Sequence, residues 1–263
     1  MNLIKKKNLA LVLSGGSARG FAHIGVLQVL EENHVPIDSI IGTSIGALVG
    51  GLYAAGKLNQ FTEKAISLSK NRILTLFLER KMKRGNTNTR TIEPFLREFT
   101  AGKKIQDLVI AFTAIATDLR TGKETFINKG DLMEAILASI SIPGIFQPVK
   151  MGNKLLVDGG VVDPLPQHYG HVIAKKVIAI NAMPCEFKYK EESDVFDIIS
   201  ESIGIMTHEL ITLKQDHNKN SVFIQLKTEK INSIDFSKIS TCIKIGRRAA
   251  EKNINKIKEL VLS

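Results

Sequence analysis

The chain has 263 residues, of which 44% are hydrophobic and 24% are charged, and only two of them are cysteines. This composition is typical of a globular protein with a substantial core, and it excludes a disordered, collagen-like or disulfide-stapled chain. The formal net charge of +10 suits an anionic partner, either a membrane surface or a nucleic acid, and does not choose between them.

The N-terminus combines lysines with an apolar run, as a signal peptide would. The run Leu9 to Leu13 is only five residues long, however, and glycines follow it instead of a cleavage site, so we expect a first strand there. The uncharged stretch from Ser39 to Gly56 is diluted by five glycines and barely reaches the length that spans a bilayer. We therefore expect no membrane span, and a cytoplasmic protein with peripheral contact at the inner membrane surface. The cysteines, Cys185 and Cys242, suit a reducing compartment and are expected in the core.

Short apolar, β-branched runs alternate with segments of helical period along the chain. This alternation predicts an α/β protein with three α/β/α layers around a largely parallel central sheet. No linker-like stretch or repeat divides the chain, so residues 1–263 are expected to form one domain. Strands are expected at residues 9–13, 39–42, 108–116, 154–157, 177–181 and 221–226, and helices at 25–32, 45–55, from an Asp131 N-cap to 139, and at 239–261.

A serine lies between two glycines in Gly42-Thr43-Ser44-Ile45-Gly46. This G-x-S-x-G pattern falls between an expected strand and an expected helix. There it is typical of a sharp turn that presents a nucleophile at the positive end of a helix. The alternative interpretation is that Ser44 only caps the start of the helix.

A second glycine-rich loop, Ser14 to Gly20, directly follows the first expected strand. Its glycines can turn backbone N–H groups towards an anion. A dinucleotide fingerprint would require glycine at Ser17, and a P-loop would require lysine at Phe21, so both phosphate-binding interpretations fail. An oxyanion-binding loop fits better, with a plain tight turn as the alternative.

The base that would activate Ser44 has two candidate types. A Ser–acid–His triad would use Asp158 with His168 or His171, but in that fold the serine follows several strands, whereas Ser44 follows only one strand and one helix. The other candidate is Asp158 itself, which ends an apolar strand and precedes Gly159 and Gly160. Burial would raise the pKa of its carboxyl and nearby backbone donors would lower it, and the sequence does not say which effect is larger.

Three motifs together resemble the patatin-like phospholipase family, particularly its small bacterial members. They are Gly15-Gly16-Ser17-Ala18-Arg19-Gly20, Gly42-Thr43-Ser44-Ile45-Gly46 and Asp158-Gly159-Gly160. The stretches around residues 116–122 and 138–148 and Leu165-Pro166 are also similar to the family. The resemblance covers about residues 8–185, and it departs from the family at Ser17, where a third glycine is usual.

The resemblance implies a serine acyl hydrolase that uses a Ser–Asp dyad without histidine, metal or cofactor. Ser44 would be the nucleophile and Asp158 the base. The backbone amides of Gly15, Gly16 and Ser17 would form the oxyanion hole, and Arg19 would hold that loop. A backbone with positive φ at Ser17 would be strained by about 1 kcal/mol or more.

The expected substrate is a lipid or fatty-acyl ester, as for a phospholipase or lysophospholipase. The alternatives are a thioesterase or general carboxylesterase on the same dyad, and a lipid- or protein-binding regulator without turnover. Residues 70–90 hold seven basic residues among apolar ones, a pattern typical of a segment that contacts anionic membrane or covers an active site. Without a known DNA- or RNA-binding pattern, no nucleic acid is expected as a partner.

Overall fold

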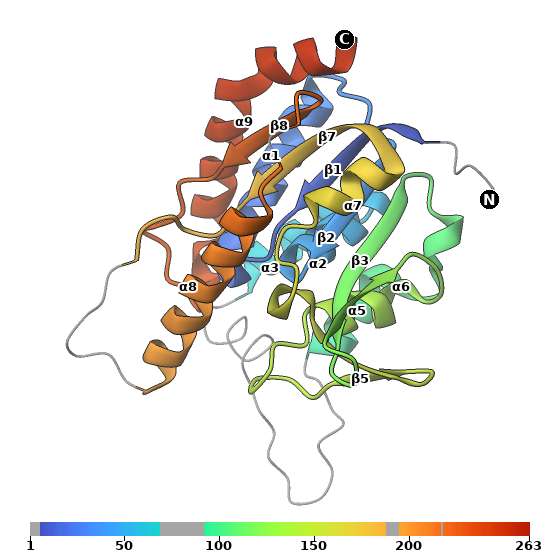
Figure 1. Cartoon of the computed structure of the whole chain (residues 1–263), viewed down its shortest axis with the longest axis vertical. Coiled ribbons are helices and arrows are strands. Elements are labelled where there is room, and N and C mark those ends of the chain that lie inside the picture. Colours follow the sequence, from blue (N-terminus) through green and yellow to red (C-terminus); the bar gives the residue numbers. More distant parts are fainter. Residues whose placement is uncertain (1–5, 69–91, 188–194, 217) are drawn as a thin grey trace, which may run out of the picture.

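The computed structural model describes residues 6–68, 92–187, 195–216 and 218–263, which build one mixed sheet with helices on both faces (Figure 1). The strands lie in the order β5-β6-β3-β2-β1-β7-β8, with β4 paired to β3. Five of them, from β3 to β8 through β2, β1 and β7, are parallel. Their bounds are β1 Lys7–Leu13, β2 Ser39–Thr43, β3 Ala111–Asp118, β4 Lys123–Ile127, β5 Val149–Met151, β6 Lys154–Asp158, β7 Ala174–Asn181 and β8 Ser221–Gln225.

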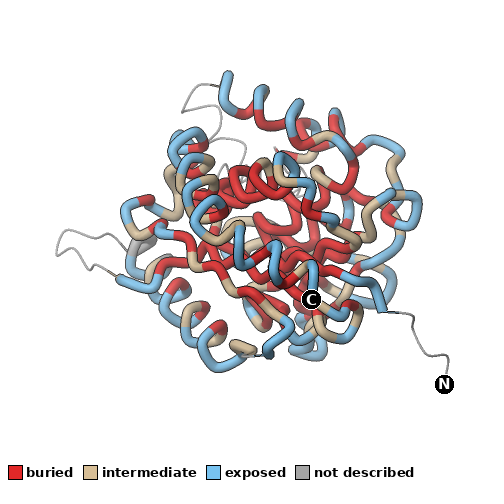
Figure 2. Tube along the Cα trace, turned by 90° about the horizontal axis from the view of Figure 1, so that it is seen from above, coloured by how far each residue is buried: buried red, intermediate tan, exposed pale blue. Residues whose placement is uncertain are grey.

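Strand β1 shows why the sheet is covered on both faces. Leu9, Leu11 and Leu13 point into one apolar cluster, whereas Ala10 and Val12 point into another. Successive side chains of a strand face opposite sides of the sheet, so a strand that is apolar throughout needs a layer on each side. The predicted three-layer arrangement is confirmed, and Figure 2 shows its buried residues gathered in the middle of the molecule.

The larger cluster packs the sheet against α1, α2, α3, α5, α6 and α9, and the smaller one packs it against α7 and the end of α8. Helix α9 lies along α1, and the glycines allow this close approach, because a Cβ at Gly246 would lie 1.8 Å from the Ala22 carbonyl oxygen. The bounds are α1 Ala22–Glu32, α2 Ile45–Ala54, α3 Leu58–Ser67, α5 Ile92–Thr100, α6 Leu132–Ser139, α7 Gln167–Ile173, α8 Val195–Lys214 and α9 Ile239–Leu262, with short 3-10 helices at Ser17–Phe21 (η1), Ile105–Asp107 (η2), Gly159–Val161 (η3) and Phe236–Lys238 (η4).

The expected helices and strands all occur close to their predicted positions. The side chain of Asp131 accepts a hydrogen bond from the Glu134 N–H and so caps α6 as predicted. The predicted strand at 108–116 begins three residues too early, because β3 begins at Ala111. Strands β4 and β5 were not expected, and both are antiparallel to their neighbours.

Several other predictions can be compared with the described residues. Cys242 is buried as expected, but the expectation for Cys185 is wrong, because this thiol is exposed. The uncharged stretch from Ser39 to Gly56 forms β2 and the buried helix α2. Among the described helices, none combines the length and the apolarity needed to cross a bilayer. The basic segment at 70–90 lies outside the described residues, so its membrane contact stays a prediction.

Candidate active site

Ser44 and Asp158 lie in direct contact although 114 residues separate them in the chain. The Ser44 Oγ donates a hydrogen bond of 2.5 Å to Asp158 Oδ2, and each residue is only 6% exposed. The sheet produces this contact, because β3 pairs with β2 on one side and with β6 on the other. Strand β6 runs antiparallel to β3 and lies outside the parallel set, and the Asp158 side chain at its end reaches Ser44 after β2.

The backbone at Ser44 forms a strained turn between β2 and α2. Its dihedral angles are φ 56° and ψ −125°, a conformation that L-residues with a side chain rarely adopt. Both flanking glycines are required by close backbone contacts. A Cβ at Gly42 would lie 2.4 Å from the Gly46 carbonyl oxygen, and a Cβ at Gly46 would lie 2.4 Å from the Leu13 carbonyl oxygen. The turn therefore holds Ser44 away from regular helix geometry.

Two side chains that the sequence did not single out as positioning groups hold this turn. The Ser139 Oγ accepts a hydrogen bond from the Ser44 N–H and donates one to the Ile115 carbonyl oxygen. On the other side, the Thr43 Oγ1 donates to the Asp163 carbonyl oxygen. The Ser44 N–H is thereby occupied, so it is not free to bind a substrate oxygen in this arrangement.

The carboxylate of Asp158 is buried and accepts two hydrogen bonds, from Ser44 Oγ and from the Gly160 N–H at 2.7 Å. Burial raises the pKa of Asp158 from 3.8 to about 6, and the hydrogen bonds from Ser44 and Gly160 oppose that rise only in part. The effect that the sequence left open is thus decided in favour of burial. Gly159 is needed for packing, because a Cβ there would lie 2.4 Å from the Ile115 carbonyl oxygen.

The glycine-rich loop lies beside Ser44, since a Cβ added at Gly15 would be 3.6 Å from the Ser44 Cβ. In this arrangement the Gly15 N–H donates to the Pro164 carbonyl oxygen at 3.0 Å, and its predicted role towards an oxyanion stays a prediction. Among the described residues, no acceptor meets the N–H of Gly16 or Ser17. The φ of Ser17 is 50°, so this serine adopts the positive φ for which a strain of about 1 kcal/mol or more is expected.

Arg19 and Gly20 fix the loop from behind. The Arg19 Nε donates a hydrogen bond of 2.7 Å to the Ile231 carbonyl oxygen in the segment after β8, and the residue is 7% exposed. A Cβ at Gly20 would lie 1.9 Å from Ile45 Cγ2, so only glycine lets η1 approach α2 this closely. Arg19 thus holds the loop without touching the Ser44–Asp158 pair.

A buried histidine supports the same loop and was not singled out by the sequence. The His23 Nε2 lies 3.0 Å from the Ser14 carbonyl oxygen. Burial lowers the pKa of His23 to about 4, so the ring is neutral and donates its Nε2 proton to this carbonyl. The Ser14 Oγ donates to the Gly15 carbonyl oxygen and accepts from the Ala182 N–H. The position of His23 one turn after the loop is the only sequence signal for this role.

The two histidines of the triad alternative lie elsewhere. Neither His168 nor His171 hydrogen-bonds to Ser44 or Asp158 in the described structure. His168 Nε2 lies 3.3 Å from Glu124 Oε1, and His171 Nε2 lies 3.0 Å from Asp216 Oδ2. The geometry therefore favours a serine–aspartate pair over a triad.

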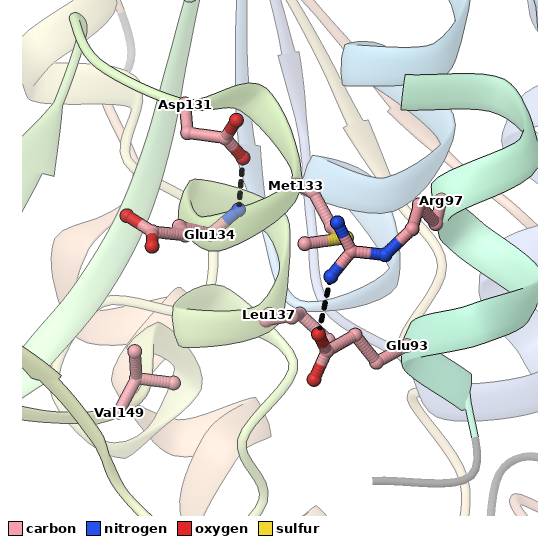
Figure 3. Close-up of a pocket in the computed structure, with 7 residues that line it drawn as sticks. All are labelled: Glu93, Arg97, Asp131, Met133, Glu134, Leu137 and Val149. Atoms are coloured by element: carbon pink, nitrogen blue, oxygen red, sulfur yellow. Dashed lines mark hydrogen bonds and ion pairs between the residues drawn. The ribbon is translucent and has the colours of Figure 1, made fainter. Parts of the chain in front are cut away.

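A surface pocket of about 330 Å³ lies between α5 and α6, away from the Ser44–Asp158 pair (Figure 3). Its lining is largely charged. Glu93 and Arg97 form an ion pair at 2.8 Å across one wall, and the carboxylate of Asp131 is occupied with the α6 cap. Neither Ser44 nor Asp158 lines this pocket.

Comparison with known proteins adds independent information. A family model described as patatin-like phospholipase matches residues 11–170. An uncharacterized NTE family protein of Mycobacterium bovis is 44% identical over 158 residues, which are 60% of this chain and 44% of that protein. The lysophospholipase NTE1 of Kluyveromyces lactis is 33% identical over 166 residues, which are 60% of this chain and 11% of that protein. The matched part is thus less than half the length of either curated relative.

The solved structure of VipD from Legionella pneumophila aligns with a TM-score of 0.49 at 14% identity, covering 96% of this chain and 67% of that chain. The family match spans more than half of the chain and contains Ser44, Asp158 and the glycine-rich loop. The chain belongs to the patatin-like phospholipase family.

Proposed function

We propose that the protein is a serine hydrolase of lipid carboxylic esters, with Ser44 as nucleophile and Asp158 as general base. The observation that carries this proposal is the 2.5 Å hydrogen bond from Ser44 Oγ to Asp158 Oδ2. The glycine-rich loop lies beside Ser44 at Gly15, and the N–H groups of Gly16 and Ser17 in that loop meet no acceptor among the described residues. The pKa of about 6 leaves Asp158 ionised at neutral pH while making it a stronger base than an exposed carboxylate.

The reaction follows from these positions. Asp158 takes the proton of Ser44 as Oγ attacks the ester carbonyl. The N–H groups of Gly16 and Ser17 stabilise the resulting oxyanion, and loss of one such donor typically costs about 10² to 10³ in rate. The protonated Asp158 then returns the proton to the departing alcohol, which leaves an acyl-serine. Water attacks this ester in the second half and gives a proton to Asp158, which passes it to Ser44 Oγ as the C–O bond breaks and the carboxylic acid leaves.

The family and the name of the yeast relative support a lipid ester as the substrate, and so does an exposed apolar face on α8. Ile199, Ile203, Met206 and Leu213 follow helical spacing and are 53%, 42%, 59% and 79% exposed. The end of α8 is tied to the segment after Asp158, because the Lys214 Nζ donates to the Val162 carbonyl oxygen. Acyl chains of a membrane or micelle would find apolar surface on this helix, whose last residue contacts the segment after Asp158.

The experiment is a panel of substrates offered to the wild type and to Ser44→Ala. The panel contains a lysophospholipid, a diacyl phospholipid, a short nitrophenyl ester and an acyl thioester. We expect turnover of long-chain oxygen esters that Ser44→Ala abolishes. Ser39→Ala is the matched control, because Ser39 is also buried on β2 and its Oγ has no hydrogen-bond partner among the described residues.

The outcomes separate the alternatives. Preferred turnover of the thioester would make the protein a thioesterase on the same dyad, and preferred turnover of the short ester a general carboxylesterase. Lipid binding by a folded wild type that turns over none of the four substrates would contradict the proposal and favour a regulator without catalysis.

A further inference from the structure

Three side chains that can bind a metal ion meet behind the nucleophile turn, on the face of the sheet that α7 covers. Glu124 lies on β4, Asp163 follows η3, and His168 lies on α7. One ligand atom from each lies within 4.8 Å of the others. His168 faces both carboxylates, with Nε2 3.3 Å from Glu124 Oε1 and Nδ1 3.4 Å from Asp163 Oδ2. The chain positions of these residues gave no metal-binding pattern, because the fold brings them together from separate elements.

The carboxylate of Asp163 is buried beside His168 and Lys214 but makes no hydrogen bond with a described residue. The side chain is fully buried, and no described residue donates a hydrogen bond to either of its oxygens. The backbone of the same residue makes the contacts that the fold needs, since its carbonyl accepts from Thr43 Oγ1 and its N–H donates to the Gly159 carbonyl oxygen. A buried carboxylate without hydrogen bonds is costly, so its retention calls for a cationic partner.

Lys214 lies at the edge of this cluster and partly compensates the charge of the Asp163 carboxylate. Its Nζ lies 3.8 Å from Asp163 Oδ1 and 4.0 Å from Glu124 Oε2, which is too far for hydrogen bonds. The ammonium donates a hydrogen bond of 3.1 Å to the Val162 carbonyl oxygen. The side chain is 36% exposed at the last residue of α8, so it can turn away into solvent without moving the sheet.

We propose that Glu124, Asp163 and His168 bind one divalent transition-metal ion, of the Zn²⁺ or Mn²⁺ class, in place of the Lys214 ammonium. Two carboxylates and one imidazole are a common donor set for these ions. Bond lengths of about 2.0 to 2.2 Å require the donor atoms to close in from their present spacing. Glu124 and His168 are 28% and 47% exposed, so both side chains have room to do so and water can complete the coordination.

The position of the site gives the ion a structural connection to the reacting pair. Asp163 and Pro164 hold the nucleophile turn and the glycine-rich loop through Thr43 and Gly15. An ion on the Asp163 carboxylate would brace this segment from behind. It would act as a positioning element and would not touch the ester.

The test is isothermal titration of tag-free protein with Zn²⁺, in a Cys185→Ser background because the exposed thiol could itself bind zinc. We expect one equivalent to bind, and Glu124→Gln and His168→Ala each to weaken binding at least about tenfold. His171→Ala is the matched control, since His171 lies on the same helix beside Asp216, and it should leave the affinity unchanged. Displacement of Mn²⁺, followed by its electron paramagnetic resonance signal, gives a second readout.

Lys214→Met separates a metal site from a plain ion-pair network. Removing a positive charge about 4 Å from the ligands should tighten metal binding roughly fivefold. Absence of saturable binding to folded protein, equal binding by His168→Ala, or weaker binding by Lys214→Met would each overturn the proposal. These variants change partly exposed side chains, and circular dichroism confirms that each is folded before titration.

Discussion

Replacement of Asp158 by Asn should remove activity and at the same time stabilise the fold. Burial raises the pKa of Asp158 from 3.8 to about 6, so the folded chain holds this proton more tightly than the unfolded chain does. Ionisation of the carboxylate at neutral pH therefore opposes folding. A difference of about two pKa units corresponds to about 3 kcal/mol of unfolding free energy at pH 7.

The size of the effect changes with pH in a defined way. Below about pH 4 the carboxyl is protonated in both states, and the cost is absent. The cost grows as pH rises from about 4 to 6 and is complete above that range. Asn is neutral throughout, and it keeps an acceptor for the Gly160 N–H and a donor for Ser44 Oγ. Asp158→Asn should thus gain up to about 3 kcal/mol at pH 7.5 and close to none at pH 4.

Urea denaturation of both proteins at the two pH values measures this difference directly. Asp107→Asn serves as the control, because it removes an exposed carboxylate and should change the unfolding free energy by less than about 0.5 kcal/mol. An Asp158→Asn variant that is less stable than the wild type at pH 7.5, or equally stabilised at pH 4, would refute the reasoning.

Three further predictions concern the base, the turn and the loop. The kcat/KM for a neutral ester should rise with pH through an apparent pKa of about 6, because Asp158 must be ionised to accept a proton, and a flat profile from pH 4 to 8 would contradict this. Gly46→Ala should prevent folding, as judged by circular dichroism, because its Cβ would meet backbone at 2.4 Å. Gly51→Ala, whose Cβ would meet only side-chain atoms of Ile136 and Phe112 at 3.0 Å or more, should fold. Ser17→Gly should raise the unfolding free energy by about 1 kcal/mol in urea by relieving left-handed strain, and no change would show that the strain is compensated.

Local patterns explain which parts of the fold could be predicted from the sequence. The parallel strands are apolar on both faces, and the helices follow 3.6-residue spacing, so β1, β2, β7, α2 and α9 were visible in the residues themselves. Strand β5 is only three residues long, and β4 reads Lys-Glu-Thr-Phe-Ile with only two apolar residues, so neither carries a strong signal. The antiparallel direction of β6 depends on its pairing with β3, which no local pattern encodes.

The candidate site likewise has features that the sequence predicts and features that only the packed structure shows. The glycines around Ser44 and after Asp158 were visible because close backbone contacts demand glycine at fixed spacing. Contacts between distant segments were not visible. Examples are the hydrogen bond from the Ser44 N–H to Ser139, and the hydrogen bond that occupies the Gly15 N–H. The balance between burial and hydrogen bonding at Asp158 likewise required the packed structure.

The most direct test of the proposed dyad is covalent labelling with a fluorophosphonate, which reacts with an activated serine, followed by mass spectrometry of the digested protein. We expect one adduct on the wild type, on Ser44, and we expect it to form at least about a hundredfold more slowly in Asp158→Asn. An adduct on another residue, or no adduct on folded wild-type protein, would contradict the proposed dyad.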